Sequence, residues 1–316
     1  MKLRVLVDNY TYIDEYYFGE PGVSYYIEDG EAKVLFDTGY TDAVLKNAEL
    51  MGIDLDDLTH IVLSHGHDDH TRGLRYMLGC GKWEDPGFSK APLHLKKAKL
   101  LGHPGVFEPK FDGAEYIGIP KEVTRLLDLK LRKGVTPADL PDELQKLDEK
   151  IEITPSEGAF KITDRLTYLG QIPRTNDFEN KEPVGERAKC TCGNRYCSCD
   201  ADGVEEKEDD FLLDDSALVY HGRDGIFVIT GCSHAGICNI VEYAKKVTGE
   251  NHVAGVIGGF HLFDLDERLE KTVEYLKGAK IDMLYPCHCV SLAAKAKMYA
   301  AMPTGEVGVG MSLEIE

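Results

Sequence analysis

A short run of metal-binding side chains follows one apolar segment of this chain and limits what the chain can fold into. Residues 61–63 have the composition of a buried strand, and four ligand-type side chains follow within six positions: His65, His67, Asp69 and His70. Imidazole and carboxylate groups bind zinc and similar ions. Gly66 permits a sharp turn inside the run. We therefore expect the first two histidines to face one ion and the Asp-His pair to face a second; the alternative is a polar surface loop.

The apolar pattern on both sides of this run alternates strands with helices. In the first third it predicts strands at 2–8, 23–28 and 33–37 and a helix at 41–51. A strand at 167–169 precedes a longer alternation, in which strands are predicted at 217–221, 226–230, 253–257 and 281–285 and helices at 236–247, 265–276 and 291–299. This order suggests two similar halves, each a sheet with helices on its outer face.

Two stretches interrupt the alternation. Residues 83–161 are rich in Lys, Pro and Gly and contain one helical run at 121–131, so we expect an insertion that covers or flanks the site as a lid. Residues 180–212 hold four cysteines and then the acidic run 200–210, and they form a second expected insertion. The length of 316 residues fits a single domain, 1–316, that carries both insertions.

The second insertion has a symmetrical cysteine pattern, C-x-C-x4-C-x-C, formed by Cys190, Cys192, Cys197 and Cys199. Four thiolates this close can complete a tetrahedral structural zinc site. The metal would supply the order that a segment with little apolar content cannot obtain from a core. The alternative is a flexible loop with free thiols or a redox pair. The remaining cysteines outside the site motifs lack such a grouping, and we expect them to pack or to support the site: Cys80, Cys238, Cys287 and Cys289.

Acidic residues outnumber basic ones by 55 to 36, which gives a formal charge of −19. A chain this acidic should repel nucleic acids and anionic membranes, and the short cluster at 96–99 is expected on a solvated helix face. The first residues lack the apolar segment of an export signal, and no apolar run is long enough to span a bilayer. We expect a cytoplasmic protein with a small-molecule substrate and neither nucleic-acid nor membrane partners; the oligomeric state is not fixed by the sequence.

The pattern H-x-H-x-D-H from His65 to His70 resembles the signature of the metallo-β-lactamase superfamily. The upstream Asp37, in Asp-Thr-Gly, resembles the first motif of that family, an Asp at a strand end. The resemblance implies an α/β fold, a four-layer αββα sandwich, with two metals at the edge of the sheets. It also implies a third His for the first metal, a bridging Asp and a last His for the second metal. His288, which follows Pro-Cys after a strand, fits the last position.

The middle of the family pattern is altered in this chain. Residues 170–174 contain no His where the third one is expected, and residues 231–236 contain no bridging Asp. We expect His234 to replace the third His, and Cys232, near the place of the bridging Asp, is an alternative bridging ligand. His261 follows the strand 253–257, so it should lie at the same edge as a proton donor or substrate contact; the alternative is a structural hydrogen bond.

Several longer segments resemble one branch of the superfamily: residues 171–174, 177–179, 230–237, 257–262 and 286–289. That branch includes the archaeal 7,8-dihydropterin-6-methyl-4-(β-D-ribofuranosyl)aminobenzene 5′-phosphate synthase of methanopterin synthesis. The resemblance covers 8–70 and 167–288 and leaves out both insertions.

The resemblance implies an enzyme with two zinc ions. Two metals about 3.5–4 Å apart activate a bridging water at neutral pH, which favours a hydrolase that uses a metal-bound hydroxide on an ester or phosphodiester. Asp69 would ligate a metal and orient the hydroxide, and His261 would stabilise an oxyanion or protonate a leaving group. Zinc is favoured over manganese or iron, because some iron-based redox members carry Glu at the position of His67 and continue into a flavin domain. The alternatives are a condensing synthase with an anionic or pterin-like substrate and a non-catalytic metal sensor.

Overall fold

The computed structural model describes residues 1–80, 92–179, 182–189 and 206–316, which fold around two large sheets. The strands of the first sheet are β1 (Lys2–Val7), β2 (Ser24–Asp29), β3 (Ala32–Phe36), β4 (His60–Val62), β5 (Ala98–Gly102), β8 (Ile151–Pro155) and β17 (Ser312–Glu314). Their order is β17-β1-β2-β3-β4-β5-β8. The strands from β3 to β8 in this order run parallel, so their carboxyl ends meet at one edge of the sheet.

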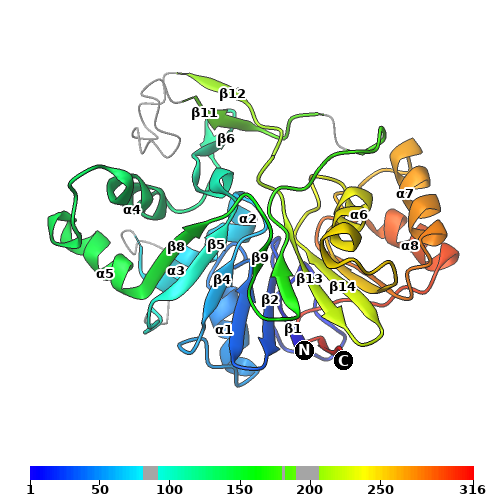
Figure 1. Ribbon diagram of the computed structural model, residues 1–316. Helices are drawn as coiled ribbons and strands as arrows, with labels where there is room; N and C mark the ends of the chain where they lie inside the picture. Colours follow the sequence, from blue (N-terminus) through cyan, green and yellow to red (C-terminus); the bar gives the residue numbers. More distant parts are fainter. Residues whose placement is uncertain (81–91, 180–181, 190–205) are drawn as a thin grey trace.

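The second sheet is built from β9 (Phe160–Lys161), β10 (Leu166–Tyr168), β13 (Ala217–Gly222), β14 (Gly225–Thr230), β15 (Val253–Gly258) and β16 (Leu284–Pro286). Their order is β16-β15-β14-β13-β10-β9, and β14, β15 and β16 are parallel. A small third sheet joins β6 (Lys110–Asp112), β7 (Glu115–Tyr116), β11 (Glu186–Ala188) and β12 (Lys207–Asp209). This small sheet lies above the junction of the two halves (Figure 1).

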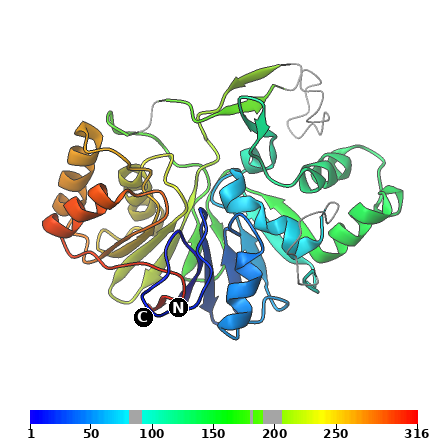
Figure 2. The ribbon, with the colours of Figure 1, turned by 180° about the vertical axis from the view of Figure 1, so that it is seen from behind.

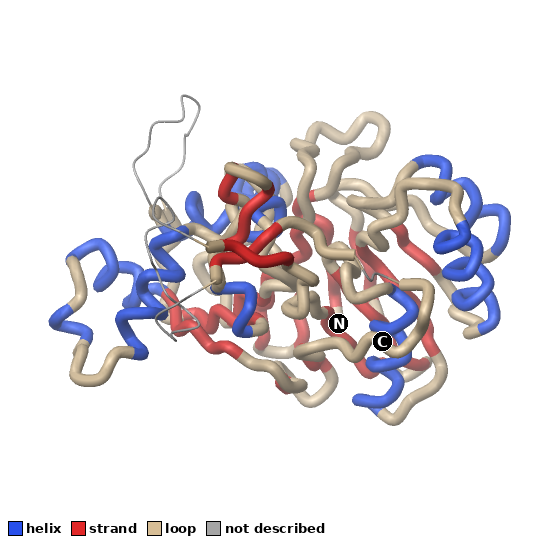
Figure 3. The backbone as a smooth tube through the Cα atoms, turned by 90° about the horizontal axis from the view of Figure 1, so that it is seen from above, coloured by secondary structure: helices blue, strands red, loops and turns tan. Residues whose placement is uncertain are grey.

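Helices cover the outer side of each large sheet (Figures 1 and 2). Those of the first half are α1 (Ala43–Leu50), α2 (Asp68–Thr71), α3 (Gly73–Leu78), α4 (Lys121–Leu131) and α5 (Asp142–Lys150), with the 3-10 turns η1 (Pro104–Phe107) and η2 (Pro137–Asp139). Those of the second half are α6 (Ile237–Thr248), α7 (Glu267–Gly278) and α8 (Leu292–Ala301). Seen from above, most helices lie at the two outer sides with the strands between them (Figure 3).

Alternating side chains in the strands fill three separate cores. In β3, Leu35 joins the apolar cluster under the first-half helices, whereas Val34 and Phe36 join the cluster between the sheets. In β14, Val228 packs under the second-half helices, whereas Phe227 faces the first sheet. This period of two is what a strand buried on both faces requires. The expected four-layer αββα sandwich is confirmed.

Part of the stretch 83–161 continues the first sheet rather than standing outside it. β5 pairs with β4, and β8 pairs with β5. Apolar side chains of these strands, such as Leu100, Leu101 and Ile151, are fully buried. Lys99, expected on a helix face, is therefore in a strand. The helix predicted at 121–131 is α4, and the role of this stretch as a lid stays a prediction.

The sequence motifs follow the carboxyl ends of parallel strands. Asp37 follows β3, the His loop follows β4, Cys232 follows β14, and His288 follows β16. Open α/β sheets bind ligands at this edge. Among the described residues, no helix has both the length and the hydropathy that crossing a membrane requires.

Candidate metal centre

Three histidines from both halves of the molecule form the first group of ligand atoms. His65, His67 and His234 have one ring nitrogen each within 4.8 Å of the others. The distances between their ring centroids are 4.8 Å for His65–His67, 4.7 Å for His65–His234 and 5.2 Å for His67–His234. The Nε2 atoms of His65 and His67 are buried and have no hydrogen-bond partner among the residues that the structure describes. Buried imidazole nitrogens of this kind are suited to a metal ion.

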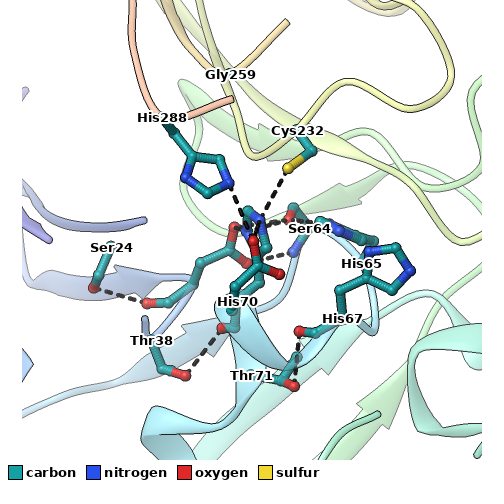
Figure 4. A network of polar contacts seen from close by, with 12 residues as sticks. Ser24, Thr38, Ser64, His65, His67, His70, Thr71, Cys232, Gly259 and His288 are labelled. Atoms are coloured by element: carbon teal, nitrogen blue, oxygen red, sulfur yellow. Dashed lines mark hydrogen bonds and ion pairs between the residues drawn. The ribbon is translucent and has the colours of Figure 1, made fainter. Parts of the chain in front are cut away.

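A second group lies beside the first and contains Asp69, His70, Cys232 and His288. Asp69 Oδ2 lies 3.4 Å from His70 Nε2 and 3.2 Å from His288 Nε2. The Cys232 thiol lies 3.1 Å from His70 Nε2. The rings of His65 and His70 are 4.2 Å apart, so the two groups adjoin. Figure 4 shows His288 and Cys232 approaching His70 from the second half, with His65 and His67 beside it.

The carboxylate of Asp37 holds the His loop in place from below. Its Oδ1 accepts a hydrogen bond from Ser64 N at 2.7 Å, and its Oδ2 accepts one from the Ser64 hydroxyl at 2.7 Å. The same Oδ2 lies 2.7 Å from His70 Nδ1. An Nδ1–H donated to this carboxylate leaves Nε2 of His70 as the basic nitrogen that faces the site. Through these contacts Asp37 forms the floor of the His loop.

His288 is held by two residues that directly follow strand β1. Its backbone N–H donates to Asp8 Oδ1 at 2.9 Å, and its Nδ1 lies 3.1 Å from Asn9 Oδ1. These contacts join residues that are 280 and 279 positions apart in the sequence. Sequence reasoning did not assign Asp8 or Asn9 to the site; their signal was only that polar side chains follow a strand.

Strained backbone gathers in the loops that carry the site. Asp37, Ser233, His261 and His288 have φ values of 58°, 58°, 49° and 50°. Non-glycine residues adopt this left-handed region rarely, and they do so where surrounding contacts impose it. Gly231, in the second half, leaves space for Ser64 in the first half, because a Cβ at position 231 would lie 2.2 Å from Ser64 Oγ. The loops are therefore fixed by tertiary contacts rather than by local preference.

A buried ion cluster supports the His loop from the small third sheet. Lys110 Nζ lies 2.5 Å from Asp210 Oδ2 and 3.1 Å from Asp214 Oδ1. Asp214 Oδ2 in turn accepts a hydrogen bond from Gly66 N at 2.9 Å, in the middle of the His loop. A side chain at position 66 would meet Lys110, because its Cβ would lie 2.4 Å from Lys110 Cε. Neither Lys110 nor Asp214 was singled out from the sequence.

The start of helix α6 fixes the loop that carries His234. Glu179 is buried, and its two carboxylate oxygens accept hydrogen bonds from Cys238 N at 2.8 Å and Asn239 N at 2.9 Å. These are the free N–H groups of the first helical turn, where a negative charge is also favoured by the helix dipole. Helix α6 begins three residues after His234, so this cap holds the end of the loop that carries His234.

His261 lies beside the first group of histidines. Its ring is 4.5 Å from the ring of His234 and 4.8 Å from that of Phe263. Its backbone N–H donates to the Cys289 thiol at 3.3 Å. Burial and the charge of Arg268 lower the pKa of His261 to about 4, so its imidazole is neutral at neutral pH. The residue therefore reaches the site, as expected from its place after β15.

The electrostatics of the two groups fit metal ions. Burial lowers the pKa of His65 and His234 well below the usual range and that of His67 to about 4, which keeps these rings in the neutral, metal-binding form. At His70 burial acts in the same direction, but the carboxylates of Asp69 and Asp37 outweigh it and raise the pKa well above normal. Carboxylates that favour a positive charge on His70 this strongly can be neutralised by a bound metal cation in place of the added proton.

The structure thus brings together every residue that the sequence assigned to the two-metal site: His65, His67, Asp69, His70, His234 and His288, with His261 alongside. Metal ligation by these residues stays a prediction. Cys232 lies in the second group, near the place expected for the bridging ligand. The residues predicted to form the structural zinc site lie outside the described part of the chain: Cys190, Cys192, Cys197 and Cys199.

Comparison with known proteins agrees with this geometry. A model of the metallo-β-lactamase superfamily matches residues 17–87, which include Asp37 and the His loop. An uncharacterized protein of Methanocaldococcus jannaschii is 30% identical over 297 residues, which are 94% of this chain and 93% of that protein. The chain belongs to the metallo-β-lactamase superfamily. Members of this superfamily usually bind metal ions, and the two clusters described above are candidate sites for them.

Three further similarities bear on the activity and the fold of this superfamily member. A 7,8-dihydropterin-6-methyl-4-(β-D-ribofuranosyl)-aminobenzene-5′-phosphate synthase of the same archaeon is 28% identical over 301 residues, covering 93% of this chain and 89% of that protein. A solved metal-dependent hydrolase of the β-lactamase superfamily superimposes with a TM-score of 0.71 at 24% identity, covering 100% of this chain and 99% of that one. A metallo-β-lactamase fold protein from Bacillus subtilis has a TM-score of 0.52 at 12% identity, with 99% of both chains covered. The chain is therefore an enzyme, a metallo-β-lactamase-fold hydrolase or a related synthase.

Proposed function

We propose that this enzyme is a metal-dependent hydrolase of an ester or phosphodiester bond. One observation carries the proposal: two adjoining groups of ligand atoms converge at the strand ends, and buried Nε2 atoms of His65 and His67 have no other partner among the described residues. His65, His67 and His234 would hold one ion. Asp69, His70 and His288 would hold the other, with Cys232 as a further candidate ligand. When bound, a pair of zinc ions supplies an activated water and an electrophile at neutral pH.

Asp69 is placed to handle the proton of the attacking water. Its Oδ2 lies between His70 Nε2 and His288 Nε2, at 3.4 Å and 3.2 Å. These neighbours lower the pKa of Asp69 well below normal against the opposing effect of burial, so the carboxylate is ionised and can accept a hydrogen bond. An ionised carboxylate beside the attacking oxygen orients that oxygen and favours loss of its proton.

His261 is placed to act on the other side of the reacting bond. Its neutral ring lies against His234 and can donate one N–H to an oxygen that gains negative charge. Because its pKa is near 4, we assign it the role of a hydrogen-bond donor rather than that of a store of protons at neutral pH.

A panel of esters and phosphodiesters with added zinc or manganese tests this proposal. We expect turnover of at least one class, and a loss in kcat/KM of more than about 100-fold in both His65→Ala and His234→Ala, since each removes a proposed ligand. His252→Ala is the matched control, because His252 is exposed and pairs with Asp282 far from the site. If His65→Ala and His234→Ala kept full activity, the site assignment would be wrong.

A condensing synthase is the second candidate, favoured by the 28% identity to the dihydropterin synthase. Such an enzyme would use the same ligands to bring two molecules together. Incubation with a reduced pterin and a ribofuranosylaminobenzene phosphate tests it by the appearance of a condensation product. A product that fails to form under conditions where an ester or phosphodiester is hydrolysed would favour the hydrolase.

A further inference from the structure

One buried carboxylate holds the backbone of the His loop at its centre. Gly66 lies between His65 and His67, two members of the first group of histidines. The N–H of Gly66 donates a hydrogen bond to Asp214 Oδ2 at 2.9 Å, and Asp214 comes from the segment that leads into β13 of the second sheet. Because both imidazoles are attached to residues next to Gly66, a shift of this peptide would turn both of them.

The other oxygen of this carboxylate is fixed by a buried lysine. Lys110 Nζ lies 3.1 Å from Asp214 Oδ1 and 2.5 Å from Asp210 Oδ2, and these three buried residues make up the ion cluster. The methylene groups of Lys110 also pack directly against Gly66, since a Cβ at position 66 would lie 2.4 Å from Lys110 Cε and 3.1 Å from its Cδ. Lys110 therefore contacts the His loop and also holds the acceptor of its central N–H.

The two acidic members of the ion cluster have different second contacts. Among the described residues, the carboxylate of Asp210 contacts Lys110 and the N–H of Leu212, the latter at 2.8 Å. The backbone of Asp210 continues the small third sheet, because its N–H donates to Gly185 O at 3.0 Å. Asp210 thus ties the lysine to the third sheet, whereas Asp214 ties it to the His loop.

The two residues that follow the second of these aspartates contact both loops of the first group. Ser216 N donates to Ser64 O at 2.9 Å, directly before the first histidine of the His loop. Asp215 Oδ2 accepts a hydrogen bond from Ala235 N at 2.8 Å, directly after His234. The segment 214–216 therefore aligns the loop of His234 with the His loop.

The second group of ligand atoms is held by other residues. His70 Nδ1 lies 2.7 Å from Asp37 Oδ2. His288 donates its backbone N–H to Asp8 Oδ1 at 2.9 Å, and its Nδ1 lies 3.1 Å from Asn9 Oδ1. The supports of the two groups are thus separate, so a change in the ion cluster should act on one ion more than on the other.

We propose that Asp214 is a positioning residue for the metal ion of the first group, and that it acts through the N–H of Gly66. Lys110 keeps the carboxylate in place, so the affinity for this ion depends on the lysine as well. The inference rests on the proposed function, because it concerns an ion of that same site. Residues that orient metal ligands without touching the metal change metal affinity by about 10- to 100-fold when they are replaced.

Competitive titration of the metal-free protein with zinc against a chromogenic chelator measures the affinities for the two ions. His67→Ala and His288→Ala identify which affinity belongs to the first group and which to the second. We expect Asp214→Asn to weaken the first-group ion by tenfold or more and to leave the second-group ion within threefold. An amide has one acceptor oxygen where the carboxylate uses two, so it cannot serve both Lys110 and Gly66.

Asp210→Asn is the matched control for this experiment. It removes the same charge from the same ion cluster and also loses one contact, but it leaves the bond between Asp214 and Gly66 in place. Its affinity for both ions should stay within twofold of wild type. Denaturant unfolding of the metal-free proteins compares their stabilities, because a purely structural role of the cluster would affect both variants alike.

The inference is overturned if Asp214→Asn binds the first-group ion as tightly as wild type does, or if Asp210→Asn weakens that ion equally. Either result leaves the proposed hydrolase untouched. If the wild-type protein binds no zinc, the proposed function is wrong and the inference falls with it. Should Asp214→Asn fail to fold, Lys110→Met decides: a loss of about threefold or more for the first-group ion supports the positioning role, and unchanged affinity overturns it.

Discussion

Carboxylates outside the candidate ligand set determine how the candidate ligands are oriented. Asp37 contacts Ser64 through both of its oxygens and fixes Nδ1 of His70 at 2.7 Å. It therefore sets both the path of the His loop and the tautomer of His70, a candidate ligand. Partners of this kind change metal affinity by about 10- to 100-fold when they are removed.

We expect Asp37→Asn to weaken metal binding by about 10- to 100-fold, because an amide nitrogen facing His70 would move the ring proton to Nε2. Competitive titration of zinc against a chromogenic chelator measures the change. Asp57→Asn, at an exposed ion pair with Lys33, is the control and should leave the affinity unaltered. Equal affinity in Asp37→Asn and wild type would show that Asp37 does not set the tautomer of His70.

Asp215 predicts a dependence of stability on pH. Burial raises its pKa to about 7 despite the hydrogen bond that it accepts from Ala235 N at 2.8 Å. The folded state therefore keeps a proton that the unfolded chain loses near its ordinary pKa of 3.8. Between these two values the folded state binds more protons, so the contribution of Asp215 to stability falls as the pH rises from about 4 to about 7 and is constant above.

Asp215→Asn removes this titration. Relative to wild type, the variant should gain on the order of 1 kcal/mol or more in the free energy of unfolding between pH 5 and pH 8. Urea unfolding at the two pH values measures the difference. The exposed Asp164→Asn change should show no such trend, and a flat difference for Asp215→Asn as well would contradict the burial argument.

At the scale of elements, the N-terminus of α6 fixes the loop that carries His234. The helix is an ordinary amphipathic segment whose apolar side packs on the second sheet. Its first turn is closed by Glu179, a residue from a distant loop, rather than by its own N-cap, Gly236. Gly236 has a φ of 97°, and a Cβ at this position would lie 2.2 Å from Glu179 Oε2. The contact therefore depends on both residues.

Glu179→Ala should reduce the free energy of unfolding by about 1–3 kcal/mol, since it leaves two buried N–H groups without acceptors. Denaturant unfolding measures this loss. Glu274→Ala, at an exposed position of the neighbouring helix α7, is the control and should change stability by less than about 0.5 kcal/mol. A loss in Glu179→Ala no larger than that of the control would mean that water replaces the carboxylate at this helix end.

At the scale of the whole molecule, the site belongs to neither half alone. The His loop and Asp37 come from the first sheet, whereas Cys232, His234 and His288 come from the second. The shared core between the sheets, with Tyr25 and Tyr168 fully buried, holds the halves together. Any ion bound by both sets of ligands would join the halves further and would bind only the folded state.

Removal of metal should therefore lower the melting temperature. A ligand present at 1,000 times its Kd stabilises the folded state by about 4 kcal/mol, which corresponds to a shift of several degrees in a chain of this size. Calorimetry before and after chelation, followed by zinc re-addition, measures the effect. His65→Ala should show a clearly smaller shift than wild type; the same shift in both proteins would place the stabilising metal elsewhere.

The sequence by itself determined the alternation of strands and helices, because a period of two or 3.6 in the apolar residues is a local property that packing only has to satisfy. It also determined the His65-to-His70 run, whose ligands are neighbours along the chain. The extent of the first sheet was underestimated: β5 and β8 are short and lie in a polar stretch, and only their pairing with β4 and with each other reveals them as strands of this sheet.

Tertiary structure alone decided which distant groups complete and support the site. His234 and His288 could be proposed from a family pattern, but their approach to the His loop depends on the packing of two sheets. The supporting roles of Asp8 and Lys110 could not be assigned from the sequence, because a lone acidic or basic residue carries no periodicity and its partners lie many positions away. Glu179 lies in a segment that resembles the synthase branch, but its contact with the start of α6 is visible only in the fold. The local apolar pattern determines the helices and strands, whereas hydrogen bonds between loops of different elements determine how the side chains of the site are oriented.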